Sequence, residues 1–303
     1  MRILISLCLF WMSAALWHAA NAQVSDAEIS AARVELVSDP SVEARDHLYG
    51  LLSRQSGPPS VESVSAYISL LAFDQRQENN TKLFNSASAA ATHFEPAAEI
   101  ITKPYLEARF LQAVARFNLE RAPQAMIEMA HVEGQARAFQ THIGEQPQWA
   151  LNLKWKADAW GMAMNAYFES EKEFHPTDEE IQTVLALYET DIAARNARAA
   201  RSLDENGLPF CAGRMIQRPA MRFPRVQNMR DLFGAVIVSF DLDGEGNVLN
   251  PVVLASVPIA TFDEDAVSTV EKWRFRPDRP RDVGQVCRLN RSSVVQPLVF
   301  QLR

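Results

Sequence analysis

Helical periodicity runs almost unbroken from Ser25 to about Ser202 and then gives way to a different pattern. Apolar residues return every three or four positions through this part, as on the buried face of an amphipathic helix. Ser25 and Ser60 stand where helix N-caps are expected, and Glu28 is spaced for a capping box with Ser25. Short breaks that contain glycine or proline separate the segments. The pattern predicts antiparallel helices joined by short turns, either a bundle or a helical-repeat array.

The segment over residues 148–168 shows this pattern most clearly. Its apolar stripe is formed by Trp149, Leu153, Trp160, Met164 and Tyr167. Lys156 is the one interruption of that stripe. We expect these aromatic side chains to pack a core and not to hold a cofactor. The alanine-rich paired helices resemble tetratricopeptide-type repeats, although no period of about 34 residues repeats cleanly.

The composition changes over residues 204–214, where turn formers appear and an arginine-rich section begins. We place a domain boundary near Leu208. Downstream, two β-branched runs flank the cluster DGEG at residues 243–246, which predicts a β-hairpin. A helix over residues 263–273 and a closing strand over residues 294–302 follow. A short helix is also expected before the hairpin, over residues 227–233.

Apolar residues alternate along the first hairpin strand, so one face of the expected sheet is apolar. These residues are Val236, Val238, Phe240 and Leu242. In the following helix, Ala266, Val270 and Trp273 form a stripe that would lie on that face. The C-terminal part is therefore predicted to be a small α+β domain, with a hairpin, a helix and a third antiparallel strand in one layer of each kind.

The turn of the hairpin has some features of a calcium-binding loop. Counted from Asp241, oxygen-bearing side chains stand at positions 1, 3 and 5 and a glycine at position 6. The glutamate required at position 12 is replaced by Val252. The flanking segments are β-branched and too short for the two helices of such a site. We interpret the run as a strand-to-strand turn, and no metal or other cofactor is expected.

The first 22 residues have the pattern of an export signal. A positive start precedes an apolar stretch over residues 3–17, and Ala-Asn-Ala stands before Gln23. His18 breaks the apolar run before it reaches the length of about 20 residues that a membrane-spanning helix usually needs. We expect cleavage after Ala22 and a periplasmic mature protein, with a retained membrane anchor as the alternative. The helical domain would then span residues 23–207, and the C-terminal domain residues 208–303.

Two cysteines, Cys211 and Cys287, lie outside the signal segment. In an oxidising compartment a pair of this kind indicates one disulfide bond. The alternative is two separate buried thiols. Neither has the setting of a nucleophile, because no histidine follows His175 in the sequence.

The charge is unevenly shared: residues 1–211 carry a net charge of −10 and residues 212–303 one of +3. A basic module on an acidic body suits an acidic partner surface, although arginines also cover many small domains. Nucleic-acid binding is disfavoured, because no basic run is interleaved with aromatic residues.

The histidines are scattered without metal-binding spacing, and no nucleophile elbow, phosphate loop or dinucleotide fingerprint occurs. The sequence therefore predicts neither an enzyme nor a small-molecule substrate.

With these elements in order, the last 85 or so residues resemble the TonB C-terminal domain family. The core motif that carries the resemblance consists of Pro219, Phe223, Pro224, Gly234, Gly244, Trp273, Phe275 and Pro277. The strands on either side of the DGEG turn, Ala266 of the helix and the closing strand complete the match. The family usually has Tyr-Pro where this chain has Phe223-Pro224.

The resemblance implies a protein-binding module that takes part in transmembrane transport. Family members deliver inner-membrane energy to outer-membrane receptors, and the receptor pairs an extended segment with an exposed strand edge. The edge strand implied here comprises Val295, Pro297, Leu298, Val299, Phe300, Gln301 and Leu302. The alternative is an edge that its own arginines and Pro297 protect from pairing. The partner would be an envelope protein, with a TonB-dependent outer-membrane receptor as one candidate and the cell wall as another.

The chain departs from the family's energy transducers in its N-terminal part. Those proteins have a membrane anchor with a Ser and a His one helical turn apart, whereas Ser13 and His18 are five positions apart here. A helical domain also replaces their long proline-rich linker. A periplasmic module that docks on an envelope protein is therefore the first hypothesis. A complete transducer with a retained anchor, and a scaffold that acts through its helical domain, are the alternatives.

Overall fold

The computed structural model describes residues 24–141, 144–170, 214–221, 233–276, 289 and 291–300. The expected signal segment, the domain boundary near Leu208 and both Cys211 and Cys287 lie outside the described residues. So does the helix expected over residues 227–233, apart from Phe233. The chain divides into two compact units, Met1–Ala115 and Arg116–Arg303.

The first unit is helical, as the periodicity predicts. Its elements are α2 (Asp26–Ser38), α3 (Val42–Leu52), α4 (Val61–Arg76), α5 (Asn80–Phe94), the 3-10 turn η1 (Glu95–Ala97) and most of α6 (Thr102–Glu120). The Ser25 hydroxyl accepts the N–H of Glu28, and the Glu28 carboxylate accepts the N–H of Ser25, so the predicted capping box is confirmed. Ser60 caps α4 in the same reciprocal way with Ser63.

The second unit contains further helices and the predicted C-terminal sheet. Its elements are α7 (Pro123–Ala138), α8 (Gln148–Ser170), β1 (Arg214–Gln217), β2 (Gly234–Leu242), β3 (Val248–Val257), α11 (Asp263–Val270), β4 (Arg274–Arg276) and β5 (Arg291–Phe300). The hairpin, helix and third antiparallel strand are confirmed as β2, β3, α11 and β5. The small pairing of β1 with β4 was not expected, because its strands lie in arginine-rich segments.

The three-stranded sheet has the order β3-β2-β5 and is antiparallel throughout the described residues. One face packs against α11, where Trp273, Phe240 and Phe262 are almost fully buried. The predicted stripe of Ala266, Val270 and Trp273 lies in this core.

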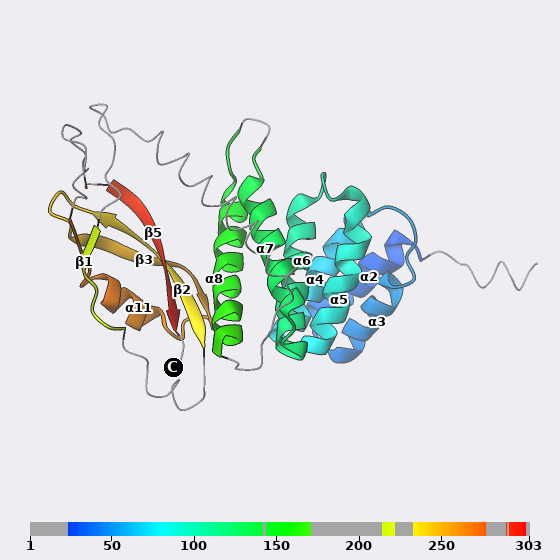
Figure 1. Cartoon of the computed structure of the whole chain (residues 1–303). Helices are drawn as coiled ribbons and strands as arrows, with labels where there is room; N and C mark the ends of the chain where they lie inside the picture. The colour runs from blue at the N-terminus through cyan, green and yellow to red at the C-terminus, as the bar shows by residue number, and fades with distance from the viewer. Residues whose placement is uncertain are drawn as a thin grey trace, which may run out of the picture. The chain divides into compact units, whose positions relative to one another are not determined.

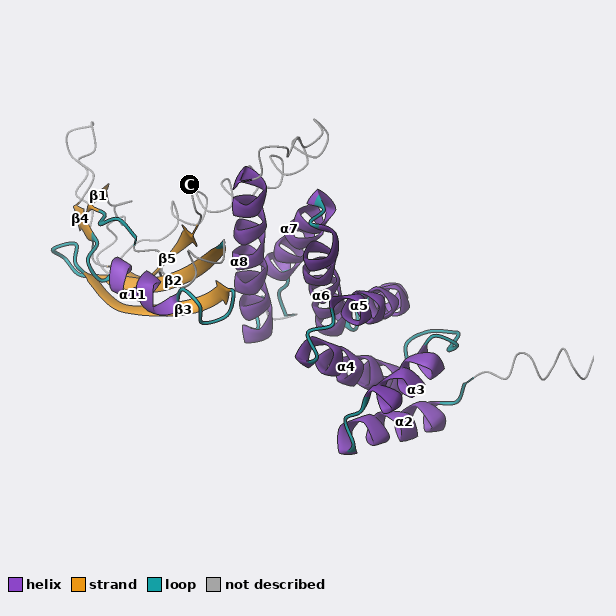
Figure 2. Ribbon diagram, turned by 90° about the horizontal axis from the view of Figure 1, so that it is seen from below, coloured by secondary structure: helices purple, strands orange, loops and turns teal. Residues whose placement is uncertain are grey.

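The opposite face of the sheet is covered by α8, so the single helical layer expected from the sequence is wrong. Figure 1 shows β2, β3 and β5 between α8 and α11, and α7 lies beside α8 in Figure 2. Ala159 and Ala163 of α8 are fully buried against Ala235, Ile237 and Val257 of the sheet. Small side chains let the helix approach the strands closely. This packing explains why β2 is buried on both faces and not on alternate residues alone.

The hairpin turn requires a glycine at Gly246. Its φ is +85°, in the left-handed region that other residues rarely adopt. A Cβ atom at this position would overlap the backbone carbonyl of Phe275. The N–H of Phe275 also donates to the Gly246 carbonyl at 2.9 Å, so neither segment can move away without losing that bond.

We expect Gly246→Ala to lower the free energy of unfolding by about 1–3 kcal/mol, because the change adds both backbone strain and a steric overlap. Gly244→Ala is the matched control, since no atom lies within 4 Å of the Cβ that it would add. Urea unfolding of the two variants measures the difference. Equal effects at the two positions would contradict the assignment of the constraint to Gly246.

Candidate protein-interaction site

The strand implied by the family resemblance lies at the edge of the sheet. β5 pairs with β2 on one side, from Gly234↔Phe300 to Leu242↔Arg291. Within the part of the chain that the structure describes, no strand pairs with its other side. The expected residues Gln301 and Leu302 lie outside that part.

The side chains of β5 alternate between the two faces of the sheet. Val294, Leu298 and Phe300 are buried in the core with α11, and Phe300 stacks on Phe262 with ring centroids 4.5 Å apart. The odd-numbered residues therefore face the α8 side, where Val295 packs. Val299, also odd-numbered, is 37% exposed.

Pro297 gives a reason to expect that the odd-numbered residues turn their backbone polar groups outward. Proline lacks an N–H, so in sheets it is found in edge strands with its nitrogen directed away from the paired neighbour. Residues two positions apart present their backbone groups to the same side. Val295 and Val299 would then offer N–H groups, and all three odd-numbered residues carbonyls, to an added strand.

The other edge strand, β3, is less regular. Asn250 has a φ of +49°, Pro251 follows it, and the register with β2 shifts at two places. β5 shows one register shift, near its first residues. Bulges keep an edge strand from pairing with other chains, and each edge strand contains one proline, so the register shifts distinguish the two. The regular edge is therefore that of β5.

An aromatic cluster holds α8 and the start of β2 together within the second unit. The Phe117 ring makes edge-on contacts with Tyr167 and Phe233, at centroid distances of 5.5 and 5.9 Å. The guanidinium carbon of Arg121 lies 4.5 Å from the Phe117 ring centroid and 5.1 Å from that of Tyr167. Such cation–π contacts favour a fixed arrangement of the elements that carry them.

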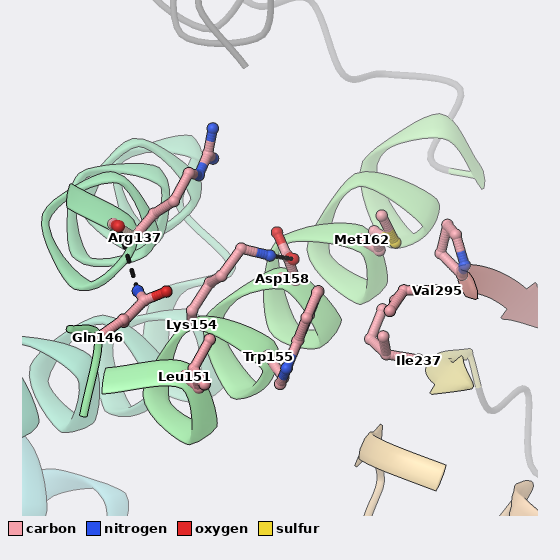
Figure 3. Close-up of a pocket in the computed structure, with 10 residues that line it drawn as sticks. Arg137, Gln146, Leu151, Lys154, Trp155, Asp158, Met162, Ile237 and Val295 are labelled. Atoms are coloured by element: carbon pink, nitrogen blue, oxygen red, sulfur yellow. Dashed lines mark hydrogen bonds and ion pairs between the residues drawn. The ribbon is translucent and has the colours of Figure 1, made fainter. Parts of the chain in front are cut away.

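A pocket of about 230 Å³ opens between α8 and the β5 side of the sheet. The sheet contributes Ile237, Val295 and Pro297, and no residue of β3 lines it. Figure 3 shows Ile237 and Val295 pointing from the strands toward α8. The remaining lining residues come from α7, α8 and the loop between them: Arg137, Gln146, Leu151, Lys154, Trp155, Asp158 and Met162.

The charged groups of the pocket form a network with Glu133 of α7. Lys154, which is 7% exposed, donates to Asp158 at 2.8 Å and lies 3.7 Å from a Glu133 oxygen. Arg137 donates to Glu133 through Nε at 2.9 Å. Lys154 also lies 3.4 Å from the ring centroid of Trp155. Among the described residues, two cations and two carboxylates thus pair with each other around the pocket.

Burial raises the pKa of Glu133, and the nearby Asp158 adds to the effect, while Arg137 and Lys154 oppose it. A raised pKa in the folded state means that this group contributes stability below its unfolded pKa and loses it as the pH rises through the folded value. We expect the stability of the native chain, relative to Glu133→Gln, to fall as the pH rises from the ordinary glutamate value of about 4.3 through the raised folded pKa. Urea unfolding across this range tests the sign, and a difference that rises with pH would contradict it.

The turn at Asp243 supports the interpretation as a hairpin corner. Its carboxylate accepts the N–H groups of Glu245 and Asn247 at 2.9 and 2.8 Å, and the side-chain amide of Asn247 at 2.7 Å. The side-chain and backbone bonds from Asn247 lower the pKa of Asp243. Both carboxylate oxygens therefore serve the turn itself. The described residues contain no group of three or more acidic, histidine or cysteine side chains that could hold a metal ion.

Several residues of the family core motif contribute to the packing of the domain. Trp273 and Phe275 are buried in the core of the α11 face. A Cβ on Gly234 would overlap Val257 and Phe262, so this glycine permits a close approach of strands and helix. Pro219 is half-buried in the segment after β1. Phe223, Pro224 and Pro277 lie outside the described residues.

Apart from Val295 and Pro297, which belong to the expected edge strand, the pocket residues were not predicted from the sequence. Lys156 interrupts the apolar stripe and drew attention, yet it is exposed, whereas the buried lysine is Lys154. The available signal was the alanine spacing at 159 and 163, which marks a helix face fit for close packing. No helix among the described residues is long and apolar enough to span a bilayer.

Residues 219–292 match the family model of the Gram-negative bacterial TonB protein C-terminal. The resemblance seen in the sequence is confirmed. Protein TonB of Vibrio cholerae serotype O1 is 27% identical over 70 residues, which are 21% of this chain and 29% of the relative. The chain thus spans under a third of that protein's length. A solution structure of the Pseudomonas aeruginosa TonB C-terminal domain matches with 24% identity and a TM-score of 0.25, over 30% of this chain and 86% of that one.

The family match and the architecture agree on the fold class. The chain is multidomain, with a helical N-terminal part and a small C-terminal domain built on an antiparallel sheet. Its C-terminal part is similar to the TonB C-terminal domain over residues 219–292.

Proposed function

We propose that this chain is an exported periplasmic protein whose C-terminal module docks on an envelope partner and takes part in transmembrane transport. The edge of β5 receives an extended segment of the partner, with a TonB-dependent outer-membrane receptor as the first candidate. The observation that carries the proposal is the regular outer edge of β5, the strand at whose first residues the TonB family match ends.

The covered faces of the sheet support edge pairing. α11 occupies one face and α8 packs on the other. The strand edge is then where a partner can form main-chain hydrogen bonds with the sheet. Pairing of this kind draws its affinity from main-chain hydrogen bonds and its specificity from alternate side chains. It needs no catalytic group, and the module's family supports a role in binding without catalysis.

Val299→Pro tests the proposal. The change removes one outward N–H from the β5 edge and places a proline ring against an added strand. We expect binding to detergent-solubilised outer-membrane proteins to fall at least about tenfold, which corresponds to 1.4 kcal/mol or more. Val299→Thr is the control, because it keeps the N–H and the β-branched shape. Equal retention by the two variants, both shown to be folded by circular dichroism, would refute pairing at this edge.

A further inference from the structure

The pocket beside β5 has no part in edge pairing itself, yet it lies where a paired segment would place its side chains. We propose that it receives a tryptophan or tyrosine side chain from the partner's extended segment. This inference rests on the proposed function and adds the side-chain specificity of the same site.

The position of the pocket follows from its lining. It takes Ile237 from the central strand and Val295 and Pro297 from the edge strand, on the face that α8 covers. α8 packs closely on Ala235 of β2 and Val257 of β3, whereas the pocket lies over Ile237, Val295 and Pro297. In a strand added to β5, the residues opposite Val295 and Pro297 point to this same face.

The size of the pocket suits one large side chain. Pockets that hold drug-sized ligands usually measure about 300–1,000 Å³. The volume here, about 230 Å³, is below that range. A single aromatic side chain fills such a space and contributes a large apolar contact area.

The chemistry of the walls favours an aromatic residue with a polar tip. Leu151, Met162 and the sheet residues form an apolar side, and Trp155 offers a ring. The lining also includes Lys154 and Asp158, whose charges are paired within the network that includes Glu133 and Arg137. A charged side chain would enter without a net opposite charge to meet it, so a neutral one is preferred.

Gln146 provides a place for the polar tip. Its side-chain N–H₂ donates to the carbonyls of Ala136 and Arg137 at 2.9 and 3.1 Å, which fixes the amide on the pocket wall. Figure 3 shows Gln146 beside Arg137, across from the strand residues. The amide oxygen remains an acceptor for an indole N–H or a phenol O–H.

The inference is tested by selecting random twelve-residue peptides, displayed on phage, against the full-length chain. We expect the selected peptides to carry Trp or Tyr at one position within a β-branched run. In synthetic copies, replacing that residue by Ala should weaken binding about tenfold, as measured by isothermal titration calorimetry. This comparison uses the native chain, so it does not depend on how any protein variant folds.

Pocket variants locate the effect. The double change Leu151→Phe and Met162→Phe fills the hollow and should abolish the preference for the aromatic peptide over its Ala version. Lys156→Phe adds the same ring on an exposed position of α8 and should leave the preference intact. An aromatic preference that survives filling of the pocket would overturn the inference.

The Val299→Pro variant distinguishes failure of the pocket inference from failure of the proposed edge pairing. Peptides that lose binding to this variant but show no Trp or Tyr preference would refute the pocket occupant and leave edge pairing in place. A selection without any peptide sensitive to Val299→Pro would count against the proposed function itself. A native chain that sediments as a dimer, and as a monomer after Val299→Pro, would assign the edge to a second copy and also overturn the inference.

Discussion

A fragment that begins at residue 208 is expected to unfold far more easily than one that begins at Arg116. The shorter fragment lacks α7 and α8, so it exposes the sheet face on which α8 packs. Ile237 and Val257, which are 1% and 5% exposed in the chain, would then meet water. Each such side chain contributes about 1.5–3 kcal/mol when buried, so the loss is roughly 3–6 kcal/mol. Small domains have a total stability of about 5–15 kcal/mol.

Urea unfolding of the fragments 208–303 and 116–303 measures this loss. Ile237→Thr serves as the internal control, because it should destabilise the longer fragment strongly and the shorter one little. The packing of α8 adds nothing to stability if both fragments unfold at the same urea concentration. The composition-based boundary near Leu208 would in that case describe the folding unit better than the division at Arg116.

Local patterns in the sequence were enough to predict the hairpin, the helix and the closing strand of the C-terminal module. Alternation of apolar residues defined β2, and the glycine-rich turn defined the hairpin, because strand period and turn chemistry are properties of neighbouring residues. The closing strand expected over residues 294–302 is observed as Arg291–Phe300, and its edge position followed from the family resemblance. The turn required Gly246, although the family motif had drawn attention to Gly244.

Contacts between distant segments could not be predicted in the same way. Ala159 and Ala163 are good helix formers in any setting, so nothing in their own segment indicates that a sheet lies against them. The pocket depends on that contact and was missed with it. The sequence did not indicate β4, because Arg274 and Arg276 flank Phe275 and charged residues rarely indicate a strand. The Arg45–Asp74 pair, 29 positions apart, likewise looks like two surface charges.

The edge at which we propose partner binding and the pocket that we propose for side-chain specificity belong to different parts of the sequence. The TonB family match covers residues 219–292 and so reaches only the first two residues of β5, whereas Leu151, Lys154 and Trp155 lie well before it. Main-chain hydrogen bonds at a strand edge form with segments of many different sequences. Under our proposal, selectivity among partners therefore comes from side-chain contacts. The helix that precedes the family module is therefore where we expect this chain to differ from its relatives in partner choice.

Asp74→Ala is expected to destabilise the first unit by about 3–5 kcal/mol, because it leaves a buried guanidinium without its carboxylate. Asp74 is fully buried and accepts two bonds from Arg45, each at 2.8 Å, and one from Ser86 at 2.6 Å. Arg45 is 4% exposed, so water cannot replace the lost partner. These bonds join α3, α4 and α5, and the whole helical unit should respond.

Asp46→Ala is the matched control, since Asp46 also binds Arg45 but its side chain is 53% exposed. Exposed ion pairs contribute about 0–1 kcal/mol, so its effect should be small. The double variant Arg45→Met with Asp74→Leu removes both charges together and should recover much of the stability lost in Asp74→Ala. Thermal and urea unfolding compare the three. If Asp74→Ala cost no more than Asp46→Ala, the buried pair would not be what holds these three helices in register.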